Sequence, residues 1–333
     1  MLRLQAYAYD RPRTLEEALR IIAEHPAAAL PIAGGTDLVP NMKHALFTPK
    51  RLVALKQLAE LRGIELRGGE LVIGAAETLT SVSRHPLVRA HAPSLARAAG
   101  LVAGPQLRNA GTIGGNICLD TRCTYYNQTY FWRSALGFCL KKDGEVCHVT
   151  KVGRKCVAAH SADTPPVLMT IGAVVDLASV DGERRVPVAD FFLADGIANT
   201  VRGWNELVTH VRIPCAAPTT RATYVKMRQR ASIDFPLLSI GLAGDFEGDV
   251  VRALRIVVSA LGARPRQVTG LDTIAVGQRL SPEVIDAVAE RAFAQCHPLE
   301  NIIVDPEWRR AMIPVHVRRG LAELAAHDPA TRA

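Results

Sequence analysis

The spacing of hydrophobic and polar residues over the first part of the chain, 1–58, predicts a small unit with a sheet and helices. The run Thr14-Leu-Glu-Glu is a capping box, and apolar residues at helical spacing follow it over 14–25. Short apolar runs at 28–33 and 51–55 predict two strands. A Gly-Gly-Thr-Asp turn between them leads into another helix start, so we expect an α/β unit here.

The segment 59–220 predicts a second α/β unit that is interrupted by a long irregular stretch. Helix and strand periods occur in the order strand 70–74, helix 86–99, helix 165–171, strand 173–177 and strand 207–213. In contrast, 118–160 shows no sustained period of either kind. Long stretches without periodicity are uncommon inside compact domains, so we interpret 118–160 as an inserted loop.

The last segment, 221–333, places strands before helices. Alternating residues predict strands at 223–228, 238–246 and 254–259, and helical periodicity follows at 281–296 and 306–326. Ser281 and Asp305 are suited to cap the two helices. This order is typical of an α+β module in which helices cover one face of a sheet. The fold class expected for the whole chain is α+β.

Composition excludes several classes of protein. Among the 333 residues, 48% are hydrophobic and 22% are charged, which is close to the globular average and unlike disordered, collagen or coiled-coil chains. No stretch approaches the ~20 uninterrupted apolar residues that span a bilayer. The first residues lack the hydrophobic core and cleavage site of an export signal. We therefore expect a cytoplasmic protein without a membrane partner.

The net charge of +8 is concentrated in the irregular stretch. Residues 121–160 hold seven basic and two acidic side chains, together with six of the 17 aromatic residues. Basic residues interleaved with aromatic ones can bind single-stranded nucleic acid. A nucleic-acid-binding module is therefore one hypothesis, and such a module would be colourless.

The same stretch holds four of the seven cysteines, Cys123, Cys139, Cys147 and Cys156. An odd cysteine count in a chain without an export signal argues against a disulfide framework. The gaps of 15, 7 and 8 residues lack the close knuckle of a zinc site and suit a larger iron–sulfur cluster. Buried cysteines without a ligand are an equally weighted alternative on these residues alone.

Two glycine-rich turns follow predicted strands or polar segments. The first comprises Pro31, Ile32, Ala33, Gly34, Gly35, Thr36, Asp37 and Leu38, and the second comprises Gly111, Thr112, Ile113, Gly114 and Gly115. Neither matches the dinucleotide fingerprint G-x-G-x-x-G or the P-loop, so neither nicotinamide nor ATP binding is supported. One such turn alone is more often only a tight turn. Two of them, each with a hydroxyl, suit a diphosphate held from both sides.

The two turns, PIAGGTDL and RNAGTIGGN, resemble the signature loops of the FAD-binding medium subunits of molybdenum hydroxylases, the group of xanthine oxidase and carbon monoxide dehydrogenase. The runs DTPP, YVKMRQRA and DFP follow in the order of that family, so the resemblance covers nearly the whole chain. It implies a two-subdomain FAD-binding domain of the PCMH-like type, 1–58 and 59–220, and a C-terminal α+β domain at 221–333.

The resemblance also implies roles for single residues. Both turns would hold the FAD diphosphate, with Thr112 as a hydroxyl donor. Asp163 would lie near the ribityl chain or adenosine, and Lys226 near the flavin ring, where a cation stabilises a reduced flavin. Further residues implied to line the site are Val102, Ala103 and Thr124. The plainer alternatives are that Asp163 caps a helix and that Lys226 is a solvated strand lysine.

In this family the TIGGN loop ordinarily runs on to the aspartate segment, whereas here the cysteine-bearing stretch intervenes. That insertion, with its run DTRCTYYNQ, is similar to the one in β subunits of the 4-hydroxybenzoyl-CoA reductase type, where it carries a [4Fe–4S] cluster. The resemblance implies that Cys123, Cys139, Cys147 and Cys156 ligate such a cluster. Cys118 is expected to be a small buried residue and not a fifth ligand.

The resemblance finally implies an electron-transfer subunit without activity of its own. Its partners would be a large molybdenum-cofactor subunit and a small subunit with [2Fe–2S] clusters, in an (αβγ)2 heterohexamer, with ferredoxin as donor and no nucleic acid. Electrons would pass through the [4Fe–4S] cluster, FAD and [2Fe–2S] clusters to molybdenum and reduce 4-hydroxybenzoyl-CoA to benzoyl-CoA. The alternative is a subunit of another molybdenum hydroxylase that oxidises a different aromatic or N-heterocyclic substrate.

Overall fold

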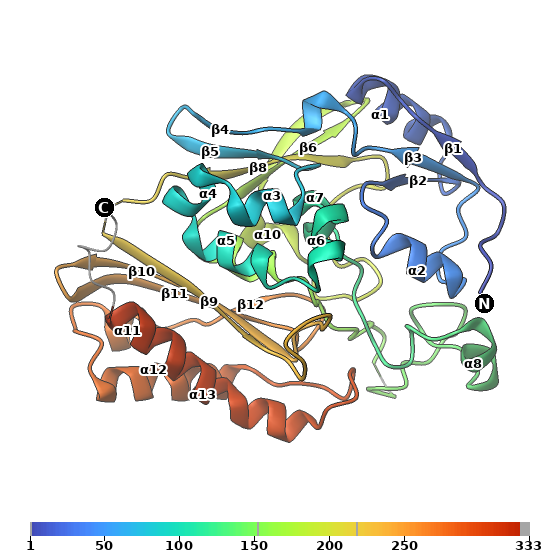
Figure 1. Cartoon of the computed structure of the whole chain (residues 1–333). Coiled ribbons are helices and arrows are strands. Elements are labelled where there is room, and N and C mark those ends of the chain that lie inside the picture. Colours follow the sequence, from blue (N-terminus) through green and yellow to red (C-terminus); the bar gives the residue numbers. More distant parts are fainter. Residues whose placement is uncertain (1, 152, 218, 327–333) are drawn as a thin grey trace.

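The first of three sheets is parallel and lies at the N-terminal end of the molecule (Figure 1). The computed structural model describes residues 2–151, 153–217 and 219–326. The sheet has the order β1-β3-β2, and its elements are β1 (Ala8–Asp10), α1 (Leu15–Glu24), β2 (Ala29–Ile32), α2 (Leu38–Lys43) and β3 (Arg51–Ala54). The Thr14 hydroxyl accepts a hydrogen bond from the Glu17 N–H at 3.1 Å, which confirms the predicted helix cap.

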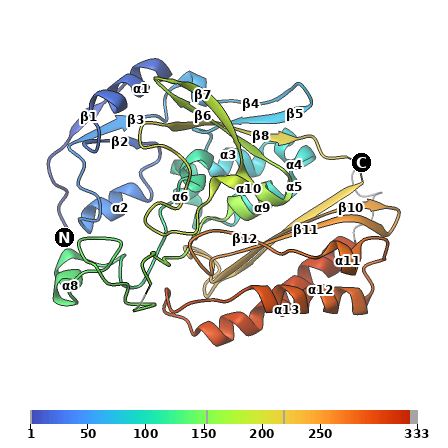
Figure 2. The same ribbon diagram turned by 180° about the vertical axis from the view of Figure 1, so that it is seen from behind.

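The second sheet is antiparallel, with the order β4-β5-β8-β6-β7. Its strands are β4 (Ile64–Arg67), β5 (Glu70–Gly74), β6 (Val174–Ser179), β7 (Gly182–Pro187) and β8 (Leu207–Pro214), with the short helices η1 (Ala59–Leu61) before it and α10 (Val188–Phe191) after β7. Figure 2 shows β6 and β7 from behind. The polar strand β7 was not predicted, because only one of its six residues is buried.

Short helices cover one face of this sheet, and most of them contribute buried residues to its core. They are α3 (Leu79–Arg84), α4 (Pro86–His91), α5 (Pro93–Gly100), α6 (Pro105–Ala110), α7 (Ile113–Ile117) and α9 (Thr164–Thr170). The single helix predicted over 86–99 is wrong, because Ala92 leaves the helical conformation (φ −143°, ψ 59°) and separates α4 from α5. A proline disfavours helical geometry at the residue before it, and Pro93 follows Ala92.

The third sheet is antiparallel, with the order β12-β11-β10-β9, and carries the C-terminal helices. Its elements are β9 (Thr220–Met227), β10 (Leu238–Glu247), β11 (Val250–Ser259), β12 (Arg266–Gln267), α11 (Asp272–Ala275), α12 (Pro282–Gln295) and α13 (Pro306–Ala325). Ser281 and Asp305 accept hydrogen bonds from the first turns of α12 and α13, as predicted. Across the described residues, no helix is both long and apolar enough to cross a membrane.

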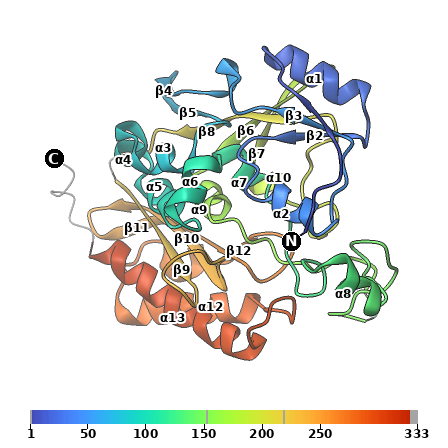
Figure 3. The ribbon, with the colours of Figure 1, turned by 45° about the vertical axis from the view of Figure 1, so that its right-hand side comes forward.

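The inserted segment leaves this layered body at one side, next to α2 (Figure 3). Arg122 and Ala159 close it at its base, since each donates its N–H to the carbonyl of the other, at 2.8 and 2.6 Å. Within the described part of the insertion the only α-helix is α8 (Tyr130–Ala135). The buried Arg133 joins α8 to the carbonyl groups of His44 and Ala45, at 3.4 and 3.3 Å.

The helix α9 packs directly on the third sheet because Gly241 in β10 has no side chain. A Cβ atom at Gly241 would lie 2.4 Å from the carbonyl oxygen of Pro166. This contact joins the second and third sheets and holds the N-terminal end of α9, where Asp163 lies.

We expect Gly241→Ala to destabilise the chain by about 1–3 kcal/mol or more, because overpacking a tight contact forces the backbone apart. Thermal unfolding should show a lower midpoint than in the parent protein. Gly262→Ala is the matched control, since nothing lies within 4 Å of a Cβ atom there. Equal midpoints for the two variants would show that the contact is not tight.

Candidate functional site

A cavity of about 560 Å³ lies between the first glycine turn and the helices that cover the second sheet. Cofactor sites typically have volumes of roughly 300–1,000 Å³, so this one is large enough for a cofactor. It brings together most of the predicted residues, namely Pro31, Ile32, Ala33, Gly34, Gly35, Thr36, Asp37, Leu38, Val102, Ala103, Gly111, Thr112, Gly114, Gly115 and Asp163. Ile113, Thr124 and Lys226 are not part of this lining.

The first turn offers unused backbone donors to the cavity. In the described part of the chain, the N–H groups of Gly34, Gly35 and Thr36 donate no hydrogen bond. Gly35 has a φ of +68°, a conformation that favours glycine. A Cβ atom at Gly34 would lie 2.1 Å from the carbonyl oxygen of Ala110, so this turn touches the segment before the second turn through main chain alone. Consecutive free N–H groups of this kind bind anions such as phosphate.

The second turn uses its donors within the fold. The N–H groups of Ile113 and Gly114 donate to the carbonyls of Glu77 and Ala75, at 3.0 and 2.9 Å. The Gly115 N–H donates to the Thr112 hydroxyl at 3.1 Å. Gly115 itself is exposed to the cavity. The two turns therefore differ, since the first supplies donors and the second supplies a wall that a ligand can approach closely.

Arg122 lies in the cavity wall. In the sequence it is only one of several basic residues of the insertion, and nothing there links it to this site. Its guanidinium donates to Asp37 at 2.7 Å and stacks on the Phe235 ring, 4.1 Å from the centroid. Burial raises the pKa of Asp37, and the Arg122 charge opposes that shift. The pair joins the first turn to the base of the insertion, a contact over 85 positions that no local pattern could predict.

The surroundings of Cys118 differ from the prediction. It was predicted to be a small buried residue, but the structure places it at the end of α7, exposed and in the cavity lining. The helix α7 ends at Ile117, and the chain turns toward the cavity after it.

Asp163 and Lys226 form a buried ion pair with 2.8 Å between Oδ1 and Nζ. The Tyr224 hydroxyl donates to Asp163 at 2.6 Å, and Lys226 also donates to the Leu101 carbonyl at 3.0 Å. Burial raises the pKa of Asp163 and lowers that of Lys226, and each charge opposes the shift of the other. Asp163 occupies the N-cap position of α9, but its side chain makes no capping bond and is held by Lys226 and Tyr224 instead. The Lys226 side chain is 1% exposed, so the alternative of a solvated lysine is wrong.

Ile113 and Thr124 have other surroundings. Ile113 is fully buried in the core of the second sheet. The Thr124 N–H donates to the carbonyl of Asn301 at 2.9 Å, which connects the insertion to the C-terminal part of the chain.

A second, smaller cavity lies inside the insertion, with Cys123, Cys139, Cys147 and Cys156 around it. All four thiols are buried and none forms a disulfide. Tyr125, Tyr126 and His148 complete much of the lining. Among the described residues, no three His, Cys, Asp or Glu side chains are close enough to hold one metal ion.

The donor set of this cavity, four cysteines around one space, is of the kind that holds an iron–sulfur cluster. The open volume is about 20 Å³, roughly the room of one water molecule, so a cluster requires the thiols to turn outward or the loop to widen. The Ala158 N–H donates to the Cys156 sulfur at 3.4 Å. Such bonds to sulfur tune the potential of a cluster.

The protonation of the thiols follows from their burial. Burial raises the pKa of Cys123 to about 11 and also raises that of Cys156. Burial acts in the same direction on Cys147, but hydrogen bonds from Thr150 and neighbouring backbone groups lower its pKa below the ordinary value. Metals bind the thiolate form, so a metal bound by these thiols would displace their protons.

Comparison with known protein families finds two matches in succession. The family described as FAD binding domain in molybdopterin dehydrogenase matches residues 5–216. The family described as CO dehydrogenase flavoprotein C-terminal domain matches residues 222–324. The first match covers the first two sheets and the insertion, and the second begins within β9.

Similar proteins extend over nearly the whole chain. The carbon monoxide dehydrogenase medium chain of Hydrogenophaga pseudoflava is 28% identical over 318 residues, or 95% of this chain and 96% of that one. The aldehyde oxidoreductase FAD-binding subunit PaoB of Escherichia coli (strain K12) is 30% identical over 305 residues, covering 89% and 92%. A solved structure of the Hydrogenophaga pseudoflava enzyme superimposes with a TM-score of 0.80 at 27% identity, covering 97% and 99%.

We expect Gly115→Val to weaken FAD binding roughly ten- to hundredfold, since overpacking by about 1–3 kcal/mol would act directly on the ligand. The measurement is the flavin content of the purified protein, read from its visible spectrum. Gly114→Val is a poor test, because a Cβ atom there would lie 2.7 Å from the Ala75 side chain and disturb the fold. Gly262→Val is the control, and normal flavin content in Gly115→Val would show that the turn does not contact FAD.

Proposed function

Since the chain belongs to the FAD-binding medium subunits of the molybdenum hydroxylase family, we propose that it carries a [4Fe–4S] cluster beside FAD in a complex of the 4-hydroxybenzoyl-CoA reductase type. The family makes it an FAD-binding electron-transfer subunit of an oxidoreductase. The cluster, the substrate and the direction of electron flow are the proposed part.

One observation carries the proposal. The four cysteines, which span 123–156, face a single cavity, and the short segment 120–123 contributes to the walls of both cavities. FAD accepts or donates one or two electrons and an iron–sulfur cluster one, so the two groups together can pass single electrons. Neighbouring cavities that share a wall would place them close enough to exchange electrons.

The residues of this chain bind and orient these groups. The free N–H groups of Gly34, Gly35 and Thr36 would hold the FAD diphosphate. The Asp163–Lys226 pair would support the flavin side of the cavity, with Asp163 in its lining and Lys226 behind it. Tyr125 and Tyr126 would exclude water from the thiols, as aromatic shells do around such clusters.

The proposed substrate class rests on the insertion. The resemblance of DTRCTYYNQ and the four cysteines to 4-hydroxybenzoyl-CoA reductases favours reductive removal of the para-hydroxyl. The named relatives, a carbon monoxide dehydrogenase and an aldehyde oxidoreductase, favour the second candidate, a complex that oxidises its substrate. The purified complex separates the two: benzoyl-CoA formation from 4-hydroxybenzoyl-CoA with a reduced low-potential donor supports the first, and its absence contradicts it.

The partners would be a large molybdenum-cofactor subunit and a small [2Fe–2S] subunit, in an (αβγ)2 complex. Reduced ferredoxin, an acidic protein, would bind the outer surface of the insertion. This surface exposes the basic side chains of Lys151, Arg154 and Lys155 and the Phe131 ring, which is 82% exposed. Charge of one sign steers an oppositely charged protein and is screened by salt.

Replacing any of Cys123, Cys139, Cys147 or Cys156 by serine should cause loss or lability of the cluster, because iron–sulfur clusters tolerate the harder oxygen ligand poorly. FAD should largely remain, since the described lining of its cavity contains none of the four. Iron and sulfide analysis with low-temperature EPR of the reduced protein measures this.

Cys215→Ser is the matched control for the four variants, because Cys215 follows β8 and lies far from the insertion in sequence. Its iron content should equal that of the parent protein. Zinc in place of iron, or an intact cluster in the variant with all four serines, would contradict the assignment.

With ferredoxin as donor, activity of the complex should fall several-fold when the ionic strength rises from about 0.05 M to about 0.3 M, as the Debye length shortens. Neutralising Lys151, Arg154 and Lys155 to glutamine should raise the KM for ferredoxin and flatten this dependence. Arg318→Gln, on α13, is the control. A KM that depends on salt equally in both variants would place the docking surface elsewhere.

A further inference from the structure

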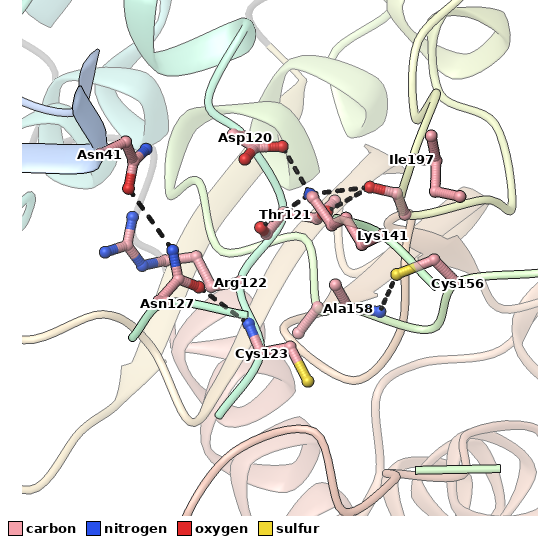
Figure 4. A network of polar contacts seen from close by, with 12 residues as sticks. Asn41, Asp120, Thr121, Arg122, Cys123, Asn127, Lys141, Cys156, Ala158 and Ile197 are labelled. Carbon is pink, nitrogen blue, oxygen red and sulfur yellow. Dashed lines mark hydrogen bonds and ion pairs between the residues drawn. The ribbon is translucent and has the colours of Figure 1, made fainter. Parts of the chain in front are cut away.

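The ion pair between Asp120 and Lys141 (Figure 4) joins the lining of the larger cavity to that of the thiol cavity. Asp120 belongs to the lining of the larger cavity and Lys141 to the lining of the thiol cavity. The Lys141 Nζ atom lies 2.6 Å from Oδ1 of Asp120. The two residues are 21 positions apart and meet because the loop between Cys139 and Cys147 folds back on the segment before Cys123.

The Lys141 ammonium is held in one place. It donates to the carbonyls of Thr121 and Gly196, at 3.1 and 2.8 Å, and to the Thr121 hydroxyl. The Tyr126 ring lies 4.4 Å away, measured to its centroid. The side chain is only 5% exposed, so water screens this charge weakly.

This charge lies close to a thiol. The backbone of Gly196, whose carbonyl accepts from Lys141, packs directly against Cys156, and a Cβ atom at Gly196 would lie 2.8 Å from the Cys156 sulfur. Figure 4 shows Lys141 between Asp120 and Cys156. Lys141 is therefore part of the wall around the thiols, with its ammonium group directed at Asp120, and Asp120 belongs to the wall of the larger cavity.

We infer that the Asp120–Lys141 pair sets the difference in reduction potential between the two redox groups of the proposed function, on which this inference rests. A fixed positive charge stabilises the more negative, reduced form of a cluster at the thiols. The Asp120 carboxylate disfavours added negative charge in the larger cavity. Electron transfer between the cluster and the flavin would move one electron and needs no proton on Asp120 or Lys141. Both residues are positioning residues, which act only through their fixed charges.

The test compares Lys141→Met and Asp120→Asn in the purified complex, with potentials from redox titrations followed by EPR and visible absorption. Lys141→Met removes the charge at similar length and should lower the cluster potential by at least about 59 mV, which is tenfold in a one-electron equilibrium. Asp120→Asn should raise the flavin potential more than the cluster potential, because Asp120 lines the larger cavity. Lys142→Met is the matched control, because Lys142 is the next residue in the chain, its side chain is 33% exposed and it pairs with Asp143 at 3.5 Å.

Unchanged potentials in both variants, with iron and FAD retained, would overturn the inference. If Lys141→Met does not fold, Asp120→Asn keeps the shape and decides through the cluster and flavin potentials. Absence of iron from the parent protein would contradict the proposed function instead. The flavin potential of Asp120→Asn then still decides whether this carboxylate acts on the larger cavity.

Discussion

The backbone pairing of Arg122 with Ala159 is the constraint on which the candidate sites depend. It brings the two ends of the insertion together, so everything from Cys123 to Cys156 is confined to one closed loop. It also fixes the segment that separates the larger cavity from the thiol cavity. The position of each thiol relative to the glycine turns is therefore set by a few backbone hydrogen bonds at the base of the loop.

Three buried or half-buried ion pairs hold this arrangement together. Asp37–Arg122, Asp120–Lys141 and Asp163–Lys226 each connect parts of the chain that are distant in sequence, and each has at least one member in the wall of the larger cavity. Of the three, Asp163–Lys226 is fully buried. Removing one partner of a buried pair typically costs about 3–5 kcal/mol, because the other charge is left without compensation. The wall of the larger cavity is therefore built from contacts between distant parts of the chain.

The sequence predicted what depends on neighbouring residues and on family motifs. The caps at Thr14, Ser281 and Asp305 and the glycine turns are local signals, and the structure contains them. Two features could not be read from the hydrophobic periodicity. The exposed edge strand β7 has no apolar face, and the break at Ala92 lies within a continuous apolar helix pattern. The partners of Lys226 and Arg122, and the exposure of Cys118, arise only from tertiary packing, which no local pattern reports.

We propose that one chain holds FAD and an iron–sulfur cluster on the two sides of the segment 120–123. Anaerobic crystallography with anomalous diffraction at the iron edge tests it most directly. The account predicts an iron peak enclosed by Cys123, Cys139, Cys147 and Cys156, and flavin density against Gly115. Absence of iron from the thiol cavity, or FAD bound away from the glycine turns, would contradict it.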